Sequence, residues 1–216
     1  MIAISATEGY RLWADTWDAT PSPIVALEER SLTPWLAELR PRRVVDVGCG
    51  TGRWMARLGG VGVDASPAML AVAGAKPGLR GRVAAADAVA LPVATACCDL
   101  TICALTLGHV RDRAAAMAEL ARILAPGGTL LLTDFHPAAA AHGWRRTFRH
   151  GGEVYELENY AYTLGEVSTD GLRLTRFLQA PIGEPERVLF ERAGRPHLFD
   201  EATRMPAVLL SWWTRV

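Results

Sequence analysis

The residues with the clearest chemical pattern form a glycine-rich turn, VVDVGCGTG at residues 44–52, in which an apolar run leads directly into the glycines. Glycines at alternate positions let a ligand approach the backbone closely, because a side chain at Gly48 or Gly50 would occupy the ligand's space. Enzymes that bind nicotinamide dinucleotides use GxGxxG, with the N-terminus of a helix facing the pyrophosphate. Here the third glycine comes one residue early, and Arg53 stands at the sixth position. With Asp46 two residues before the first glycine, the pattern favours a ligand without a pyrophosphate.

Two further acidic residues follow predicted strands downstream of the turn. Asp64 ends the run VGVD, 18 residues after Asp46. A carboxylate at that point can accept both hydroxyls of a ribose, which selects a ligand of the adenosine type. Asp87 follows the next short strand and is placed to hydrogen-bond the amino group of an adenine. Three features at strand ends, in this order and spacing, are more specific than the glycine pattern alone.

These residues need a sheet to bring them together, and the chain from residue 42 to 135 alternates between strand and helix patterns. Such alternation with short loops predicts a parallel sheet covered by helices on both faces. Apolar, β-branched runs predict strands at 44–48, 61–64, 82–86, 98–105 and 129–135. Helical periodicity predicts helices at 52–58, 66–75 and 111–124, after an N-terminal helical region at 10–39 that is broken at 20–23.

After residue 135 the rhythm changes. Residues 136–162 form a longer, more aromatic link, in which we expect a helix and an extended segment lying over one end of the sheet. A short helix at 164–168, a strand at 172–181, a helix at 185–194 and a last strand at 206–216 are predicted to follow. No repeat, low-complexity tract or Pro/Gly/Ser-rich linker interrupts the chain. We therefore expect one domain over residues 1–216.

Composition limits the class of protein. A chain of 216 residues, half of them hydrophobic and 21% charged, fits one soluble α/β domain with a large core. The formal net charge is zero, which argues against a nucleic-acid partner. Neither a basic start followed by an apolar run nor an apolar stretch of about 18 residues is present, so we predict no secretory signal and no membrane span. The four cysteines lack metal-ligand spacing, so no metal site is expected, and we expect a cytoplasmic protein with free thiols.

Four segments together resemble a known family. VVDVGCGTGRW, VGVDASPAML, ADAVALPVATACCDLTICALTLGHV and ELARILAPGGTLLLTDFHP are similar to the successive motifs of class I S-adenosylmethionine (SAM)-dependent methyltransferases. They look most like the small-molecule branch that includes the ubiquinone/menaquinone-biosynthesis enzymes (methyltransferase type 11). The resemblance covers about residues 40–137 and fades beyond them. The opening GYRLWADTWD is also similar to the Y-x-x-W-A-x-x-Y-D start of that branch, with Trp17 where tyrosine is usual.

The resemblance implies a fold and a division of the chain. It implies a Rossmann-like, mostly parallel sheet of seven strands with helices on both faces and an antiparallel last strand. The parts would be an N-terminal helical cap at 1–40, a SAM-binding core at 41–137, a substrate lid at 138–163 and the C-terminal part of the sheet at 164–216. The implied cofactor is SAM, with S-adenosylhomocysteine (SAH) as product. The implied partner is a small-molecule methyl acceptor, with no nucleic acid or membrane, and the protein would be a monomer or homodimer.

The resemblance also implies which residues hold SAM. The glycines would lie under the methionine part, Asp64 on the ribose and Asp87 on adenine, and two aromatic residues near the N-terminus would close over the cofactor. The full set of expected cofactor-binding residues is Tyr10, Trp13, Asp46, Gly48, Cys49, Gly50, Gly52, Asp64, Ala65, Asp87, Ala88 and Ala104. Tyr10 and Trp13 could equally be core anchors of an amphipathic helix.

Catalytic and acceptor residues are less marked in the sequence. Methyl transfer from a sulfonium is an in-line displacement, so positioning supplies much of the acceleration, and a general base is needed only if the acceptor must lose a proton. His109, after the fourth predicted core strand, and His136, which follows the fifth, are the candidates for a base or a substrate contact. The alternative for each is a loop histidine satisfied by the backbone. The expected acceptor contacts in the lid are Trp144, Arg145, Tyr155 and Tyr160, although that segment also fits a solvated helix face.

Several functions stay open at this stage. The favoured one is methylation of a small molecule at O, N or C. A tRNA or protein methyltransferase is less favoured, because no basic face or RNA-binding appendage is visible. A protein of another class would keep this fold and bind SAM or its product, but catalyse a different step or serve as a binding module. The retained acids Asp46, Asp64 and Asp87 argue against lost cofactor binding, but not against altered chemistry.

Overall fold

The main sheet has seven strands in the order β4-β3-β2-β5-β6-β10-β9, in a computed structural model that describes residues 1–216. Its strands are β2 (Val44–Val47), β3 (Val61–Asp64), β4 (Val83–Ala85), β5 (Cys98–Ala104), β6 (Leu124–Phe135), β9 (Leu172–Pro181) and β10 (Pro206–Arg215). Neighbouring strands are parallel from β4 to β6, whereas β10 is antiparallel to both β6 and β9. The predicted seven-stranded, mostly parallel sheet with an antiparallel last strand is confirmed.

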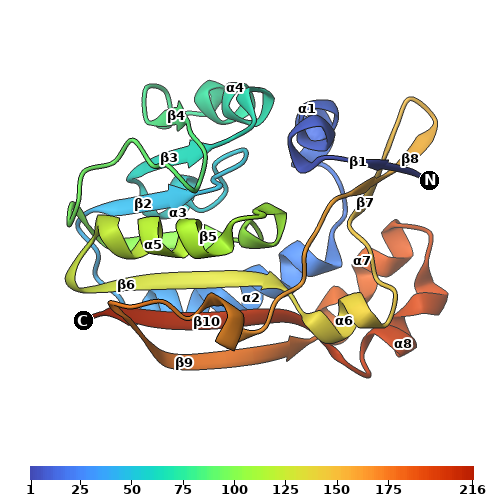
Figure 1. Cartoon of the computed structure of the whole chain (residues 1–216). Coiled ribbons are helices and arrows are strands. Elements are labelled where there is room, and N and C mark those ends of the chain that lie inside the picture. The colour runs from blue at the N-terminus through green and yellow to red at the C-terminus, as the bar shows by residue number, and fades with distance from the viewer.

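Helices cover both faces of this sheet, with α5 on one side and α2 on the other (Figure 1). The helices are α1 (Ala6–Trp17), α2 (Pro23–Ala37), α3 (Met55–Leu58), α4 (Pro67–Ala75), α5 (Arg113–Ile123), α6 (Pro137–Ala141), α7 (Arg187–Arg192) and α8 (Phe199–Ala202), with short 3₁₀ turns at Leu107–His109, Leu164–Val167, Glu184–Glu186 and Pro196–Leu198. Alternate residues of β6 pack against the helices on opposite faces of the sheet. Leu130 and Leu132 are buried in one cluster with Met117 of α5, and Leu131 in another with Leu27 of α2. No helix is long and apolar enough to cross a membrane.

Within residues 41–137, two element boundaries differ from the sequence prediction by three residues or more, and the backbone explains both. α3 begins at Met55 and not at residue 52, because Gly52 has a φ of 81°, outside the right-handed helical region. β6 begins at Leu124 and not at residue 129. Leu124 already pairs with Cys98 of β5, and the register shifts before the next pair, Leu100 with Thr129. Residues around Gly127, at φ 76°, form the irregularity that accommodates this shift.

A second, three-stranded sheet joins the N-terminal segment to the predicted lid. β1 (Ile2–Ile4) pairs in parallel with β8 (Glu153–Leu157), which pairs antiparallel with β7 (Thr147–His150). β1 was not predicted, and residues 136–162 contain α6 and the β7–β8 hairpin where we expected a helix and an extended segment. We call α1, β1, β7 and β8 together the cap, a unit that differs from the helical cap predicted at residues 1–40 because it excludes α2 and includes the β7–β8 hairpin. The cap lies beyond the carboxyl ends of the parallel strands (Figure 1).

Aromatic packing holds α1 onto the hairpin. The rings of Trp13 and Phe148 are stacked, with centroids 4.7 Å apart and planes 7° apart, and Phe148 stacks in turn on Tyr155 at 5.3 Å. Leu157 completes this small buried cluster. Because β1 extends the same sheet, the N-terminal segment and residues 147–157 form one packed unit.

Candidate functional site

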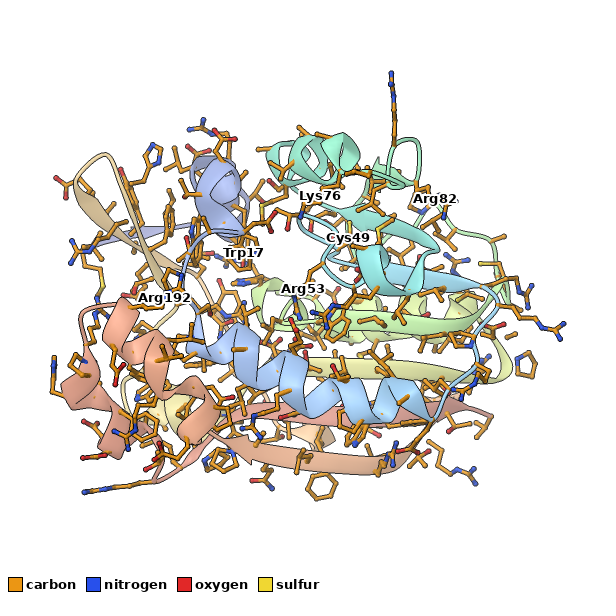
Figure 2. All side chains as sticks on the ribbon, turned by 180° about the vertical axis from the view of Figure 1, so that it is seen from behind. Trp17, Cys49, Arg53, Lys76, Arg82 and Arg192 are labelled. Carbon is orange, nitrogen blue, oxygen red and sulfur yellow. The ribbon has the colours of Figure 1, made fainter.

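A cavity of about 510 Å³ lies between the main sheet and α1, at the carboxyl ends of the parallel strands. Open α/β sheets bind ligands in this position. Its lining includes eleven of the residues singled out from the sequence: Tyr10, Asp46, Gly48, Cys49, Gly50, Asp64, Ala65, Asp87, Ala88, Ala104 and His109. Trp17 and Arg53, both labelled in Figure 2, line it from α1 and from the glycine-rich loop.

The three glycines of the loop serve three different purposes. Gly50 has a φ of 53°, and a Cβ there would have only the Met69 methyl nearby, at 3.5 Å, so it would stand at the cavity wall. A Cβ on Gly48 would lie 2.2 Å from the side chain of Thr106, in the loop after β5. A Cβ on Gly52 would lie 2.5 Å from Leu79, and Gly52 does not line the cavity. The alternating pattern therefore combines one close approach to the cavity with two internal packing constraints.

Asp64 is held by the loop that it faces. One carboxylate oxygen accepts the backbone N–H of Gly50 and the other that of Ser66, each at 2.8 Å. Burial raises the pKa of this carboxyl, and the two N–H donors partly counter that shift. A carboxylate offers about four lone-pair sites, so each oxygen retains capacity for a ligand hydroxyl. The geometry therefore fits recognition of a pair of neighbouring hydroxyls.

Asp46 differs from Asp64 because no residue donates a hydrogen bond to its side chain. Only 2% of the residue is exposed, and its carboxyl faces the cavity floor. Burial raises its pKa to about 7, while the nearby Arg53 opposes the shift and the carboxyls of Asp64 and Glu28 add to it. A buried carboxylate without a partner costs folding free energy and suits a cationic ligand group.

Asp46 gives a pH-dependent stability prediction. Its pKa is raised from 3.8 to about 7 on folding, so the folded state favours the protonated form and stability is lost as the pH rises through this interval. Asp46→Asn removes the ionisation. We expect the variant to be more stable than wild type by up to about 4 kcal/mol at pH 8, with the difference shrinking to its lowest value near pH 4. Urea unfolding at both pH values measures it, and a difference that does not change with pH would contradict the assignment.

The remaining expected contacts at the strand ends are small residues and one acid. Asp87 uses one oxygen to accept the backbone N–H of Val89, two residues on, at 3.1 Å, which leaves the other oxygen available. Ala65 and Ala88 lie beside the two acids, and Ala104 is the last residue of β5. These positions surround the cavity with short side chains that leave room for a flat ring.

His109 lies in the cavity wall within a half-buried network. Its Nε2 is 3.0 Å from the Tyr10 hydroxyl and 2.9 Å from Nη1 of Arg146, and its Nδ1 is 2.7 Å from the Glu158 carbonyl oxygen. Arg146 forms an ion pair with Asp134 at 3.0 Å, where the two side chains are 11% and 2% exposed. Burial and the Arg146 charge lower the pKa of His109 to about 3. The imidazole is therefore neutral at physiological pH.

Seven of the expected site residues do not line the cavity. Trp13 faces the hairpin, where it stacks on Phe148, and its indole N–H donates to Thr20 at 3.0 Å. The other expected residues that the structure places outside the lining, in addition to Gly52, are His136, Trp144, Arg145, Tyr155 and Tyr160. Tyr160 contacts a lining residue, because its hydroxyl donates to Glu158, at the cavity mouth, at 3.2 Å.

His136 has a structural role at the start of α6. Its Nδ1 accepts the backbone N–H of Ala138 at 3.0 Å, which caps the helix, and its Nε2 is 3.0 Å from the side-chain oxygen of Gln179. Trp144 packs against Phe135, and Arg145 forms an ion pair with Glu156 at 3.3 Å. These contacts explain why the residues point away from the cavity.

Sequence reasoning missed several residues that line the cavity. Trp17 lines the cavity from the end of α1. In the sequence, only its place in the aromatic N-terminal motif indicated a role in the site. Glu158 and Arg111 form an ion pair of 3.1 Å at its mouth, although 46 residues separate them in sequence. Leu105 adopts a φ of 56°, which is rare for a branched side chain, in the loop after β5. Nothing in a single sequence indicates such long-range pairing or backbone strain.

Comparison with known proteins agrees with this geometry. Residues 45–132 match a family model described as a methyltransferase domain. The demethylmenaquinone methyltransferase of Thermus thermophilus is 37% identical over 110 residues, which cover 46% of this chain and 50% of that protein. The chain thus spans about half the length of the curated relatives it matches.

Solved structures agree over a larger part of the chain. A SAM-dependent methyltransferase from Mesorhizobium loti superposes with a TM-score of 0.63 at 24% identity, covering 88% of this chain and all of the other. The N-methyltransferase NodS from Bradyrhizobium japonicum, solved with SAH, gives 0.66 at 17% identity, covering 97% and 96%. At these identities the structures establish the fold. The chain therefore has the fold of SAM-dependent methyltransferases, and its residues 45–132 match a methyltransferase-domain model.

Proposed function

We propose that this protein transfers a methyl group from SAM to a small-molecule acceptor. The observation that carries the proposal is the convergence of three carboxylates, Asp46, Asp64 and Asp87, on one cavity at the ends of neighbouring strands. Each carboxylate retains lone pairs that the protein does not use. Such a set matches a ligand with a cationic amine, a ribose diol and an amino-purine, and SAM contains all three.

The residues divide along the cavity in the order of the strands. We assign Asp87 and Ala88 to the adenine, Asp64 to the ribose hydroxyls, and Asp46 with Gly50 to the methionine part. The unpartnered, buried carboxyl of Asp46 would gain a counter-ion from the methionine ammonium, which offsets the cost of its burial. Tyr10 and Trp17 of α1 would exclude water from above. The acceptor is assigned to the end of the cavity near Tyr10, Thr106 and Glu158, away from Asp87.

Bound SAM would supply a sulfonium methyl group, an electrophile that is transferred by in-line displacement. The protein's part is to hold both reactants in line and to exclude water, which accounts for most of the acceleration in such reactions. The cavity volume of about 510 Å³, shared between cofactor and acceptor, favours a small molecule over a nucleic acid or a protein. The zero net charge supports the same choice.

The activity is tested by transfer of tritium from methyl-labelled SAM to a panel of phenols, quinols, amines and carbon acids. We expect label in an extractable small molecule with wild type, and roughly ten- to a hundredfold less with Asp64→Ala when SAM is below the wild-type dissociation constant. Label in added tRNA or protein, or no transfer to any acceptor by a protein that binds SAM, would overturn the proposal. The second of these outcomes would favour the rival function of a SAM-binding module.

The cap gives a prediction about motion. Asp18, just after α1, holds the cap to the core through an ion pair with Lys76 at 2.6 Å and a hydrogen bond from Thr51 at 2.7 Å. We expect SAM or SAH to slow hydrogen exchange in residues 5–18 and in 138–163 together, because β1 and β8 join them in one sheet. Exchange in residues 129–134 of β6 should hardly change. If only one of the two segments responds, they do not move as one unit.

A further inference from the structure

His109, one of the two candidates for a general base or a substrate contact, has neighbours from several distant segments. Tyr10 approaches it from α1, Arg146 from the segment before β7, and the Glu158 carbonyl from the end of β8. Asp134 of β6 lies behind Arg146 and neutralises its charge. The carboxylate of Glu158 is turned to Arg111 at the mouth. These groups decide which protons the imidazole carries.

Two neighbours fix the same tautomer independently. A carbonyl oxygen can only accept, so the 2.7 Å contact between Glu158 O and Nδ1 requires a proton on Nδ1. A guanidinium can only donate, so the 2.9 Å contact between Arg146 Nη1 and Nε2 requires a free lone pair on Nε2. A second proton on the ring would lose the Arg146 contact and place two half-buried cations together. The imidazole is therefore a neutral acceptor whose one lone pair is already engaged.

The same lone pair faces the hydroxyl of Tyr10, which lines the cavity. The hydroxyl lies 3.0 Å from Nε2 and 3.4 Å from Nη1 of Arg146. Arg146 Nη1 also donates to the carbonyl of Leu105, whose backbone φ is 56°, at 2.8 Å. Arg146 thus ties together α1, the loop after β5 and, through Asp134, the end of β6.

We propose that His109 is a positioning residue and not a general base: with Arg146, it holds the Tyr10 hydroxyl in the wall of the cofactor cavity. This inference rests on the proposed function, because it assigns roles around the SAM cavity. On this assignment no imidazole in the cavity removes a proton from the acceptor, because His109 is the only histidine in the lining and its lone pair is engaged.

The tautomer is tested directly by nuclear magnetic resonance of the full chain with ¹⁵N-labelled histidine. Long-range ¹H–¹⁵N correlations report which ring nitrogen carries the proton, and the five histidines are few enough to resolve. The signals of His109 are those lost in His109→Gln, or those left over after single substitution of the other four. We expect the Nδ1–H form to persist from pH 8 to pH 5. An Nε2–H form, or titration within this interval, would overturn the proposal.

The positioning role is tested by calorimetry with SAH. Glutamine can place an oxygen acceptor near the position of Nε2, whereas leucine fills similar volume without one. We expect His109→Leu to weaken SAH binding roughly tenfold and His109→Gln to restore most of it. Tyr10→Phe combined with His109→Leu should be no weaker than the worse single variant, because both remove one interaction. Equal loss in the two His109 variants, or additive losses in the double variant, would contradict the role.

These tests separate two failures. If wild type binds neither SAM nor SAH, the proposed function fails, while the tautomer measurement still judges the network. If wild type binds both and His109 titrates near neutral pH, the positioning role fails and the proposed function stands.

Discussion

Gly50→Val is expected to abolish SAM binding while the far-UV circular dichroism stays near that of wild type. Gly50 has a φ of 53°, and the space around a Cβ there is the cavity itself. A valine would strain the backbone and fill the space that the methionine part of SAM needs. Calorimetric titration with SAM measures the loss.

Gly78→Val is a matched control that separates the effect of backbone strain from the effect of filling the cavity. Gly78 is exposed, has a φ of 79° and has nothing within 4 Å of a Cβ. Gly78→Val therefore introduces similar backbone strain outside the cavity lining, and we expect it to bind SAM as wild type does. Normal binding by Gly50→Val would show that no ligand approaches this backbone.

Asp64→Ala is expected to weaken SAM binding by roughly ten- to a hundredfold or more. Each charge-assisted hydrogen bond to a ribose hydroxyl is worth about 1.5–3 kcal/mol, and the substitution removes the acceptor for both. It also frees the N–H groups of Gly50 and Ser66, which loosens the loop. The folded core should survive, because Asp64 stands at the end of its strand.

The control for this variant is a carboxylate with no role in the site. Asp170 is exposed in the turn before β9, and Asp170→Ala should leave the dissociation constant unchanged. Thermal unfolding of both variants shows whether Asp64→Ala is folded. A folded Asp64→Ala that binds SAM with wild-type affinity would remove the adenosine-site assignment.

Local patterns were sufficient to predict the core of the fold. Short-range signals such as the β-branched run before Gly48 and the Ser66-Pro67 helix start act within a few residues, and the strands and helices they predict are present. Alternating strands and helices leave few topologies, because parallel crossovers are right-handed and short. The positions of Asp64 and Asp87 at strand ends follow directly from that topology.

The cap could not be predicted in the same way. The β1–β8 pairing joins residues 2–4 to residues 155–157, and nothing local indicates that register. Side-chain orientation could not be predicted either. The helical spacing of Trp13 and Trp17 does not reveal which of the two faces the cavity. The structure turns Trp13 to Phe148 and leaves Trp17 at the cavity.

Histidine roles were the least predictable part of the site. His109 and His136 both follow core strands, which gave them equal standing in the sequence. Their roles depend on partners from distant segments: Arg146 and Glu158 for one, Gln179 and the α6 N-terminus for the other. Tautomer and charge are properties of these contacts, so they follow only from the three-dimensional arrangement.

Calorimetric titration of wild type with SAM, SAH and NADH tests most directly whether the cavity below α1 binds SAM. We predict saturable one-to-one binding of SAM and SAH, and no specific binding of NADH, because the glycine loop lacks the spacing that a pyrophosphate requires. Binding of NADH in preference to SAM, or no binding of SAM and SAH by the folded protein, would contradict the account.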